Sequence, residues 1–324
     1  MLRYILYAYL FLTSLALFAQ DNLQQDLRLA QQYTRQGEYE KAASIYERLY
    51  EQNPKSSMYY RNYYNALLAV KDFTRAEELV KKQLKQDKND PTLYIDLGLL
   101  LKGQSKVEEA EAEFEKALKM AKDNQIQNIA SVFSNADEHN YAIKAYLKGR
   151  ELFKDSRMFA RELAQEYKQT GDTNNAISCY LDYAAIQPDH IQIIYNELQR
   201  FTEKEDDMDE LQRQLYSRIQ KETSELIYTE ILIWAFYQQK DFEQALIQVK
   251  ALDKRLNEDG KRLMELAKKA MTEKQYDIAI GAYEYIIAKG ENNPLYVTAR
   301  EELLNCRNEK ITATPNYTQE DLRG

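Results

Sequence analysis

The sequence predicts an all-α solenoid of about eight antiparallel helix hairpins. Three observations predict it: a pattern of small and large apolar residues recurs about every 34 residues, only nine glycines and five prolines interrupt the chain, and 44% of the 324 residues are hydrophobic. A fixed period between about 20 and 50 residues is typical of repeat proteins, in which each unit packs on its neighbours. One continuous helical array therefore accounts for most of the chain.

The first nineteen residues predict a secretory signal peptide. Arg3 precedes a largely apolar stretch from Tyr4 to Phe18, and Ala19 then supplies the small residue of a cleavage site. This stretch is shorter than the roughly 20 residues that span a bilayer, so we expect cleavage after residue 19 and export of the mature chain. An uncleaved membrane anchor is the alternative.

In the second helix of each repeat, one residue, usually alanine, is followed one helical turn later by a large apolar residue. The spacing of four residues puts both side chains on one face of the helix. The eight positions lie 32 to 35 residues apart, and seven of them hold alanine. They are Ala42, Ala76, Ala110, Ala142, Ala176, Leu211, Ala245 and Ala279, and their large partners are Tyr46, Val80, Phe114, Tyr146, Tyr180, Leu215, Val249 and Tyr283.

The first helix of each repeat carries a large residue, a small one and then a second large one. Leu97-Gly98 with Leu101 and Leu29-Ala30 with Tyr33 are the clearest copies. Polar turns such as Thr170-Gly171-Asp172 separate the two helices, because glycine and aspartate favour chain reversal. A small residue lets neighbouring helices approach to the near end of the usual spacing of about 8–10 Å, so the pattern predicts tightly packed hairpins.

These two linked motifs resemble the tetratricopeptide repeat (TPR) family, whose pattern on a 34-residue period is W-x2-L-G-x2-Y, then A-x3-F, then P. The resemblance covers residues 23–293 and places a repeat array at residues 20–293. It implies hairpins that stack into a right-handed superhelix. The family's tryptophan is missing from its usual place in every copy, and the closing proline survives only at Pro54 and Pro188. A HEAT-type helical solenoid is the alternative.

The sixth copy, at about residues 191–225, is degenerate and keeps little besides Leu211 and Leu215. Where Leu211 or Ile233 stands at a position that is usually small, the neighbouring helix must lie further away. We therefore expect a local change of superhelical pitch near this repeat. A hinge between two blocks of repeats and a normally stacked but diverged repeat both fit the sequence.

The sequence beyond the array predicts one more helix, residues 294–310, which caps the apolar face that every solenoid must cover. Residues 311–324 predict a linker or the start of a missing C-terminal part, because Thr318 begins a helix-start pattern with few residues left after it. A disordered tail is the alternative.

The composition offers little material for catalysis or metal binding. The chain has two histidines and two cysteines, and it shows no nucleotide-binding glycine loop and no nucleophile elbow. The excess of 52 acidic over 44 basic residues disfavours nucleic acid as a partner. Cys179 and Cys306 lie nearly four repeats apart, so we expect buried thiols rather than a bridge. We therefore expect no enzyme activity, no cofactor and no metal site.

Resemblance to the TPR family implies a non-catalytic scaffold that binds a peptide or protein partner along a concave groove, which the first helices line. Trp234 and Tyr237 are the preferred anchors, because aromatic residues dominate interface energies; filling of a void beside the sixth repeat is the alternative role of Trp234. The candidate groove residues, offset from the packing stripe of each first helix, are Arg61, Asn65, Ile95, Leu99, Gln127, Arg161, Gln165, Ile227, Glu230, Trp234, Tyr237 and Lys268.

The signal peptide and the scaffold role together predict a protein of the bacterial cell envelope, soluble in the periplasm and touching the membrane only through a partner. The sequence is also compatible with a homo-oligomer. The sequon Asn316-Tyr317-Thr318 leaves a eukaryotic secretory origin open. The alternative function is a periplasmic sensory or docking arm of a larger envelope protein, part of a secretion or signalling machinery that continues beyond Gly324.

Overall fold

The computed structural model describes residues 22–202, 204–222 and 225–313, and all regular structure in these ranges is helical. The prediction of an all-α fold is confirmed. A first helix occupies residues 22–35. The helices that follow are α2 (Tyr39–Gln52), α3 (Ser57–Ala69), α4 (Phe73–Gln86), α5 (Pro91–Gly103), α6 (Val107–Met120), α7 (Ile126–Asn135), α8 (His139–Phe153), α9 (Ala160–Thr170), α10 (Thr173–Ile186), α11 (Ile191–Phe201), α12 (Glu205–Lys221), α13 (Leu226–Gln238), α14 (Phe242–Leu256), α15 (Lys261–Thr272), α16 (Tyr276–Ile287) and α17 (Tyr296–Ala313), with short 3-10 turns at Asp123–Gln125 and Pro188–His190.

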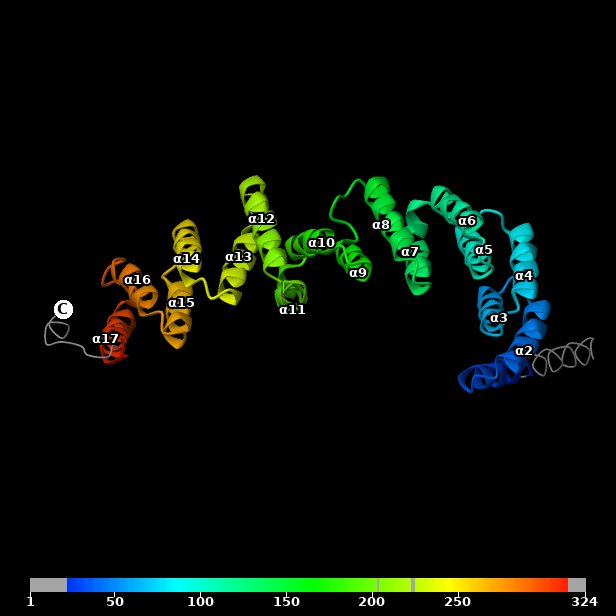
Figure 1. Ribbon diagram of the computed structural model, residues 1–324, viewed down its shortest axis with the longest axis horizontal. Helices are drawn as coiled ribbons and strands as arrows, with labels where there is room; N and C mark the ends of the chain where they lie inside the picture. Colours follow the sequence, from blue (N-terminus) through cyan, green and yellow to red (C-terminus); the bar gives the residue numbers. More distant parts are fainter. Residues whose placement is uncertain (1–21, 203, 223–224, 314–324) are drawn as a thin grey trace, which may run out of the picture. The chain divides into compact units, whose positions relative to one another are not determined.

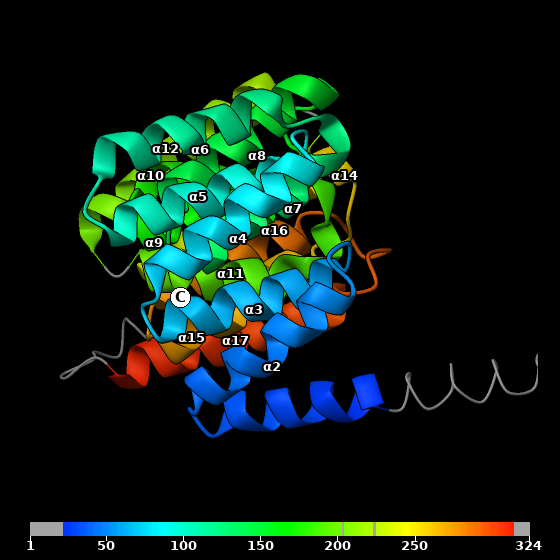
Figure 2. The ribbon, with the colours of Figure 1, turned by 90° about the vertical axis from the view of Figure 1, so that its right-hand side faces the viewer.

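The chain divides into two compact units, Met1–Lys154 and Asp155–Gly324. The first unit holds the helices up to α8, and the second holds α9 to α17. Within the first unit the helices from residues 22–35 to α6 follow one another in chain order, as Figures 1 and 2 both show. The division lies in the loop after α8, whereas the hinge that the sequence left open would lie at the sixth repeat.

The loop at the division has an unusual backbone. Lys154 and Phe159 both lie in the left-handed region, with φ of 54° and 57°. Large side chains rarely adopt this conformation, which costs roughly 1 kcal/mol or more per residue. Neither residue belongs to a repeat motif, so the periodic pattern carried no information about this loop.

Seven of the hairpins turn by the same backbone device. After each first helix one residue adopts a left-handed conformation, with φ between 57° and 77°, and the next amide donates to a carbonyl five residues earlier at 2.8–3.0 Å. This bonding pattern ends a helix by satisfying its last free carbonyls. The left-handed residues are Gly37, Lys71, Ser105, Asp137, Gly171, Lys240 and Lys274.

An aspartate starts the second helix in several hairpins. Asp72, Asp172 and Asp241 accept hydrogen bonds from backbone amides in the first turns of α4, α10 and α14, at 3.0–3.1 Å. A carboxylate at this position satisfies free amides and interacts favourably with the positive end of the helix dipole. The turn signatures in the sequence therefore correspond to a left-handed residue followed by a helix cap.

The alanine positions of the second helices lie in the core. All seven alanines are at most 1% exposed, and so is Leu211 of the sixth repeat. At Gly98 a Cβ atom would come within 2.4 Å of the Phe114 ring, which shows how closely α5 and α6 approach. The small residues thus permit the tight helix pairs that the sequence predicted.

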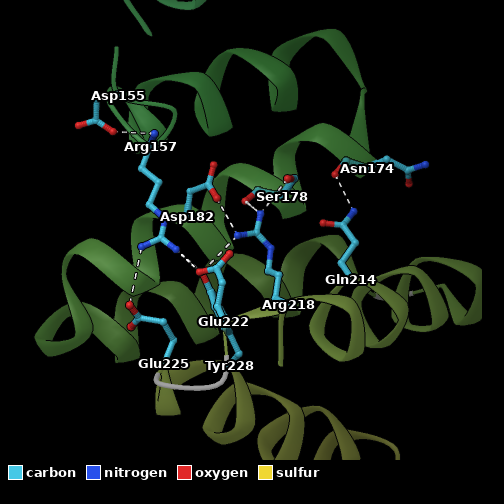
Figure 3. Close-up of polar contacts among 10 residues, drawn as sticks. All are labelled: Asp155, Arg157, Asn174, Ser178, Asp182, Gln214, Arg218, Glu222, Glu225 and Tyr228. Atoms are coloured by element: carbon cyan, nitrogen blue, oxygen red, sulfur yellow. Dashed lines mark hydrogen bonds and ion pairs between the residues drawn. The ribbon is translucent and has the colours of Figure 1, made fainter. Parts of the chain in front are cut away.

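The sixth hairpin is built differently. α11 and α12, its two helices, contact each other less than the two helices of the other hairpins do in the described parts of the chain. α12 packs instead against α10 and α13. The Arg218 guanidinium on α12 donates to the Asp182 carboxylate at 2.7 Å and to the Ser178 carbonyl at 2.9 Å, both on α10 (Figure 3).

The same polar cluster joins the loop before α9 to the end of α12. Arg157 pairs with the carboxylates of Glu222 and Glu225, and Tyr228 of α13 donates to Glu222 at 3.2 Å (Figure 3). Gln214 of α12 donates to the Asn174 carbonyl at the start of α10 at 3.0 Å. Polar contacts therefore hold α12 in place where the alanine-based packing pattern has been lost.

The last helix, α17, packs against α16 through Ala299 and Cys306, which are both completely buried. It spans Tyr296–Ala313, whereas the sequence predicted the capping helix at residues 294–310. Cys179 and Cys306 are both buried, and neither forms a disulfide within the described residues. The proposed signal peptide and residues 314–324 lie outside the described residues. Among the described helices, none has the length and apolar character needed to cross a bilayer.

Candidate partner-binding site

The second unit contains a hollow of about 250 Å³ on the side formed by first helices. Its walls come from α11, α13 and α15, the first helices of the last three hairpins, and its floor comes from α14. The residues that line it are Tyr195, Glu230, Ile233, Trp234, Tyr237, Val249, Arg262, Glu265 and Lys269. Three of them, Glu230, Trp234 and Tyr237, are groove residues that the sequence predicted.

Aromatic rings form one side of the hollow. The Trp234 ring stacks on the Tyr195 ring, with centroids 4.9 Å apart and an interplanar angle of 9°. Tyr237 lies one turn further along α13 and contacts Phe242 at 5.8 Å between ring centroids. Burial raises the pKa of Tyr195 to about 12, and it also raises the pKa of Tyr237. Both phenols therefore stay neutral at physiological pH and present hydroxyl groups beside an apolar surface.

Charged side chains form the opposite wall. Arg262 of α15 donates to Glu230 of α13 at 2.9 Å and to Glu258 at 3.1 Å. The ammonium of Lys269 lies 5.3 Å from the centre of the Tyr237 ring. These contacts fix α15 against α13 and leave the aromatic surface between them open to solvent in part.

Contacts link the first helices of the second unit one after another. Lys168 of α9 pairs with Glu197 of α11 at 3.1 Å. The stack of Tyr195 on Trp234 joins α11 to α13, and the pair of Arg262 and Glu230 joins α13 to α15. Four first helices therefore share one continuous surface in this unit.

In the first unit, Arg61 is engaged inside the protein. Its guanidinium donates at 2.5 Å to the carboxylate of Asp96, which is completely buried and also accepts from the Tyr60 hydroxyl at 2.7 Å. Burial raises the pKa of the Asp96 carboxyl, although both partners oppose this. Tyr64 donates to the Asp96 carbonyl at 2.8 Å, so the cluster ties α3 to α5.

The remaining predicted groove residues differ in exposure. Ile95 is completely buried and Ile227 is 8% exposed, so both belong to the core and we leave them out of the proposed groove. Both sit early in their helices, where the neighbouring helix covers them. The others present surface: Leu99 is half-buried, whereas Asn65, Gln127, Arg161, Gln165 and Lys268 are exposed.

Sequence reasoning missed Tyr195, Arg262 and Lys269. Tyr195 lies in the degenerate sixth repeat. The first helix of that repeat shows no packing stripe in the sequence, so the position of a groove residue could not be counted from it. Arg262 and Lys269 line the hollow from α15, whereas the offset rule selected the adjacent Lys268, which lies beside the lining residues. The available signal for Tyr195 was an aromatic residue between Ile194 and Leu198, the two apolar residues that are buried in α11.

Comparison with protein families decides the assignment. Models of the tetratricopeptide repeat match residues 23–66, 91–124 and 162–190. The chain contains tetratricopeptide repeats. The matched segments fall on hairpins of both units, and the unmatched hairpins continue the same succession of helices. No curated protein matches the sequence.

Solved TPR structures resemble the chain at low identity. The P58(IPK) TPR domain is 15% identical over 89% of this chain and 99% of its own, with a TM-score of 0.27. A thermophilic TPR protein from Thermus thermophilus is 19% identical over 52% of this chain and 94% of its own, with a TM-score of 0.32. The C-terminal part of a TPR protein from Cytophaga hutchinsonii is 15% identical over 84% and 98%, with a TM-score of 0.34.

Proposed function

We propose that this chain is an exported, non-catalytic scaffold that binds a peptide or protein partner along the surface that the first helices form within each unit. Tetratricopeptide repeats support a role in protein–protein interaction, and the fold is typically a non-catalytic scaffold. The residues proposed for binding are Asn65, Leu99, Gln127, Arg161, Gln165, Glu230, Trp234, Tyr237 and Lys268, together with Tyr195. The hollow of the second unit is the main anchoring site.

The observation that carries this proposal is the aromatic surface of the hollow. The only tryptophan of the chain is half-buried there beside two half-buried tyrosines. Aromatic side chains in hollows contribute most to the binding energy of protein interfaces, because they offer a large apolar surface at little entropic cost.

The test uses Trp234 as its own reporter, since it is the sole tryptophan. Dodecapeptides are selected from a displayed random library on the purified full chain, and each selected peptide is titrated while tryptophan emission is recorded. We expect a blue shift on binding, because the peptide removes water from the ring. Replacement Tyr237→Ala should weaken binding by about tenfold or more, the usual loss at an interface hot spot.

The matched control is Tyr216→Ala, which removes an exposed tyrosine from α12, a second helix outside the hollow. It should bind the selected peptides as the unchanged chain does. Peptides that leave the Trp234 emission unchanged and bind the Tyr237 variant equally well would show that the hollow is not the site. Melting curves of both variants, followed by circular dichroism, verify that each remains folded.

Export is tested separately. The envelope location is proposed from residues 1–19, where Arg3, the apolar stretch and Ala19 form the pattern of a cleavable signal peptide. Mass spectrometry of the chain purified from the envelope fraction of its bacterium should find a mature N-terminus at Gln20. A chain that retains Met1 would contradict cleavage.

A further inference from the structure

Charge is distributed unevenly between the two sets of helices in the second unit. The first helices α9, α11, α13 and α15 carry seven basic and five acidic residues. The second helices α10, α12, α14 and α16 carry six basic and ten acidic residues. The surface that holds the hollow is therefore net positive, although the whole chain has a net charge of −8.

Most of the excess comes from α15, the helix that forms one wall of the hollow. It carries Lys261, Arg262, Lys268 and Lys269 against a single acid, Glu265. Arg262 is engaged by two carboxylates, those of Glu230 and Glu258. The three lysines have no ion pair with any described carboxylate, and all three are exposed.

Toward α9 the counts are balanced, since α9, α11 and α13 together carry three basic and four acidic residues, but some cations there lack a carboxylate of their own. One carboxylate, Glu197, serves two cations, Lys168 at 3.1 Å and Arg200 at 3.0 Å. Arg161 of α9 is exposed and makes no ion pair within the described residues. Cations therefore outnumber acids on the α15 side of the aromatic hollow, and Arg161 adds a cation without a described ion pair on the α9 side.

Resting on the proposed function, we propose that the partner is an acidic peptide segment that carries a large apolar or aromatic side chain. The apolar side chain occupies the hollow against Trp234 and Tyr237. Its flanking carboxylates face Lys268 and Lys269 on one side and Arg161 on the other. Complementary charge of this kind steers association and selects among partners, while the buried aromatic contact supplies most of the affinity.

A basic segment fits the same surface poorly. The acids of the hollow are Glu230, which Arg262 neutralises, and Glu265, which lies within one helical turn of Lys268 and Lys269. A cationic ligand would meet Glu265 beside these two lysines and would compete with Lys269 for the Tyr237 ring. Like charges brought together at an interface disfavour binding.

The experiment compares charge variants of the full chain on peptides that have been shown to shift Trp234 emission. The double replacement Lys268→Glu with Lys269→Glu reverses the charge beside the hollow. The matched control, Lys221→Glu with Lys254→Glu, makes the same change in charge at exposed sites on the second helices α12 and α14. Each peptide is also prepared with its Asp and Glu replaced by Asn and Gln.

We expect selected peptides to be rich in Asp and Glu around an aromatic or leucine residue. The Lys268 and Lys269 variant, and the neutralised peptides, should each bind about tenfold more weakly, whereas the control variant should bind normally. Raising the salt from about 50 to about 300 mM should weaken only the acidic peptides, because salt screens exposed charges.

The outcomes separate this inference from the proposed function. Peptides that shift Trp234 emission but bind equally well after neutralisation would overturn the acidic ligand and leave the hollow as the binding site. Peptides that leave Trp234 emission unchanged would overturn the site itself. Equal loss in both double variants would show that net charge alone, rather than the cations beside the hollow, sets the affinity, and would also overturn the inference.

Discussion

At the scale of single residues, Gly98 shows how far one methyl group decides the packing of a hairpin. A Cβ atom there would lie 2.4 Å from the Phe114 ring and 3.0 Å from the Ala110 carbonyl. Phe114 is itself locked between Phe133 and Tyr141, with ring centroids at 5.3 and 4.9 Å. The ring therefore has little room to move aside.

We predict that Gly98→Ala destabilises the chain by about 1–3 kcal/mol, the usual cost of overpacking a core. This is opposite to the intrinsic preference, since alanine favours a helix over glycine by up to about 1 kcal/mol. Gly281→Ala in α16 is the matched control: its Cβ would meet only Leu246, at 3.6 Å, and stability should stay equal or rise. Urea unfolding of both variants measures the difference. Equal effects would show that α5 and α6 are not in the tight contact described.

Sequence patterns reveal which residues are small but not which distant polar groups meet. The stripe of alanines and Gly98 followed from spacing alone, and its burial is confirmed. The pair of Arg61 with Asp96 could not follow in this way, because the two residues lie on neighbouring first helices 35 positions apart and their contact depends on the distance between those helices. Ile95 was selected by the same offset as Arg61, yet the closer packing of α5 buries it completely.

At the scale of whole helices, α12 depends on polar contacts more than its neighbours do. Arg218 donates to Asp182 and Ser178 of α10 and to Tyr228 of α13, and its side chain is only 15% exposed. We predict that Arg218→Ala costs about 2–3 kcal/mol, because hydrogen bonds to a charged group are worth about 1.5–3 kcal/mol and Asp182 loses its cation.

The control is Arg213→Ala on the same helix, whose side chain is 75% exposed and, within the described residues, forms an ion pair with Glu210 alone. Its effect on the free energy of unfolding should stay within about 0.5 kcal/mol, as for other exposed ion pairs. Hydrogen exchange should show faster exchange in α12 and in the start of α13 for the Arg218 variant alone. Unchanged protection there would mean that apolar packing of Leu211 and Leu215 suffices to hold the helix.

The sequence could identify the sixth hairpin as different but could not say what replaces the lost pattern. A repeat motif describes contacts between neighbouring units at fixed spacing. Arg157 and Glu222 meet across 65 positions, and neither occupies a motif position. For the same reason the division of the chain after Lys154 was not foreseen, since it depends on a loop rather than on a stripe of packed residues.

At the scale of the whole molecule, the 26 tyrosines make stability sensitive to alkali. Burial raises the pKa of tyrosines in both units, well above 10 for Tyr60 and Tyr64 in the first and to about 12 for Tyr195 and Tyr283 in the second. A tyrosine in the unfolded chain loses its proton near pH 10. Between pH 10 and about 12 the folded state therefore binds more protons than the unfolded state, so stability falls as the pH rises.

We therefore predict that the stability contributed by these tyrosines is fully present below pH 10 and is lost as the pH rises toward 12. Absorbance at 295 nm, which reports tyrosinate, should rise in step with the loss of helical circular dichroism, since the buried hydroxyls ionise only when their helices open. Tyr283→Phe should move this transition to higher pH, because phenylalanine fills the buried site, 1% exposed for Tyr283, without an ionisable group. Tyr39→Phe, at an exposed helix start, should leave it in place. Tyrosinate that forms fully while the helices persist would show that the hydroxyls reach solvent in the folded chain.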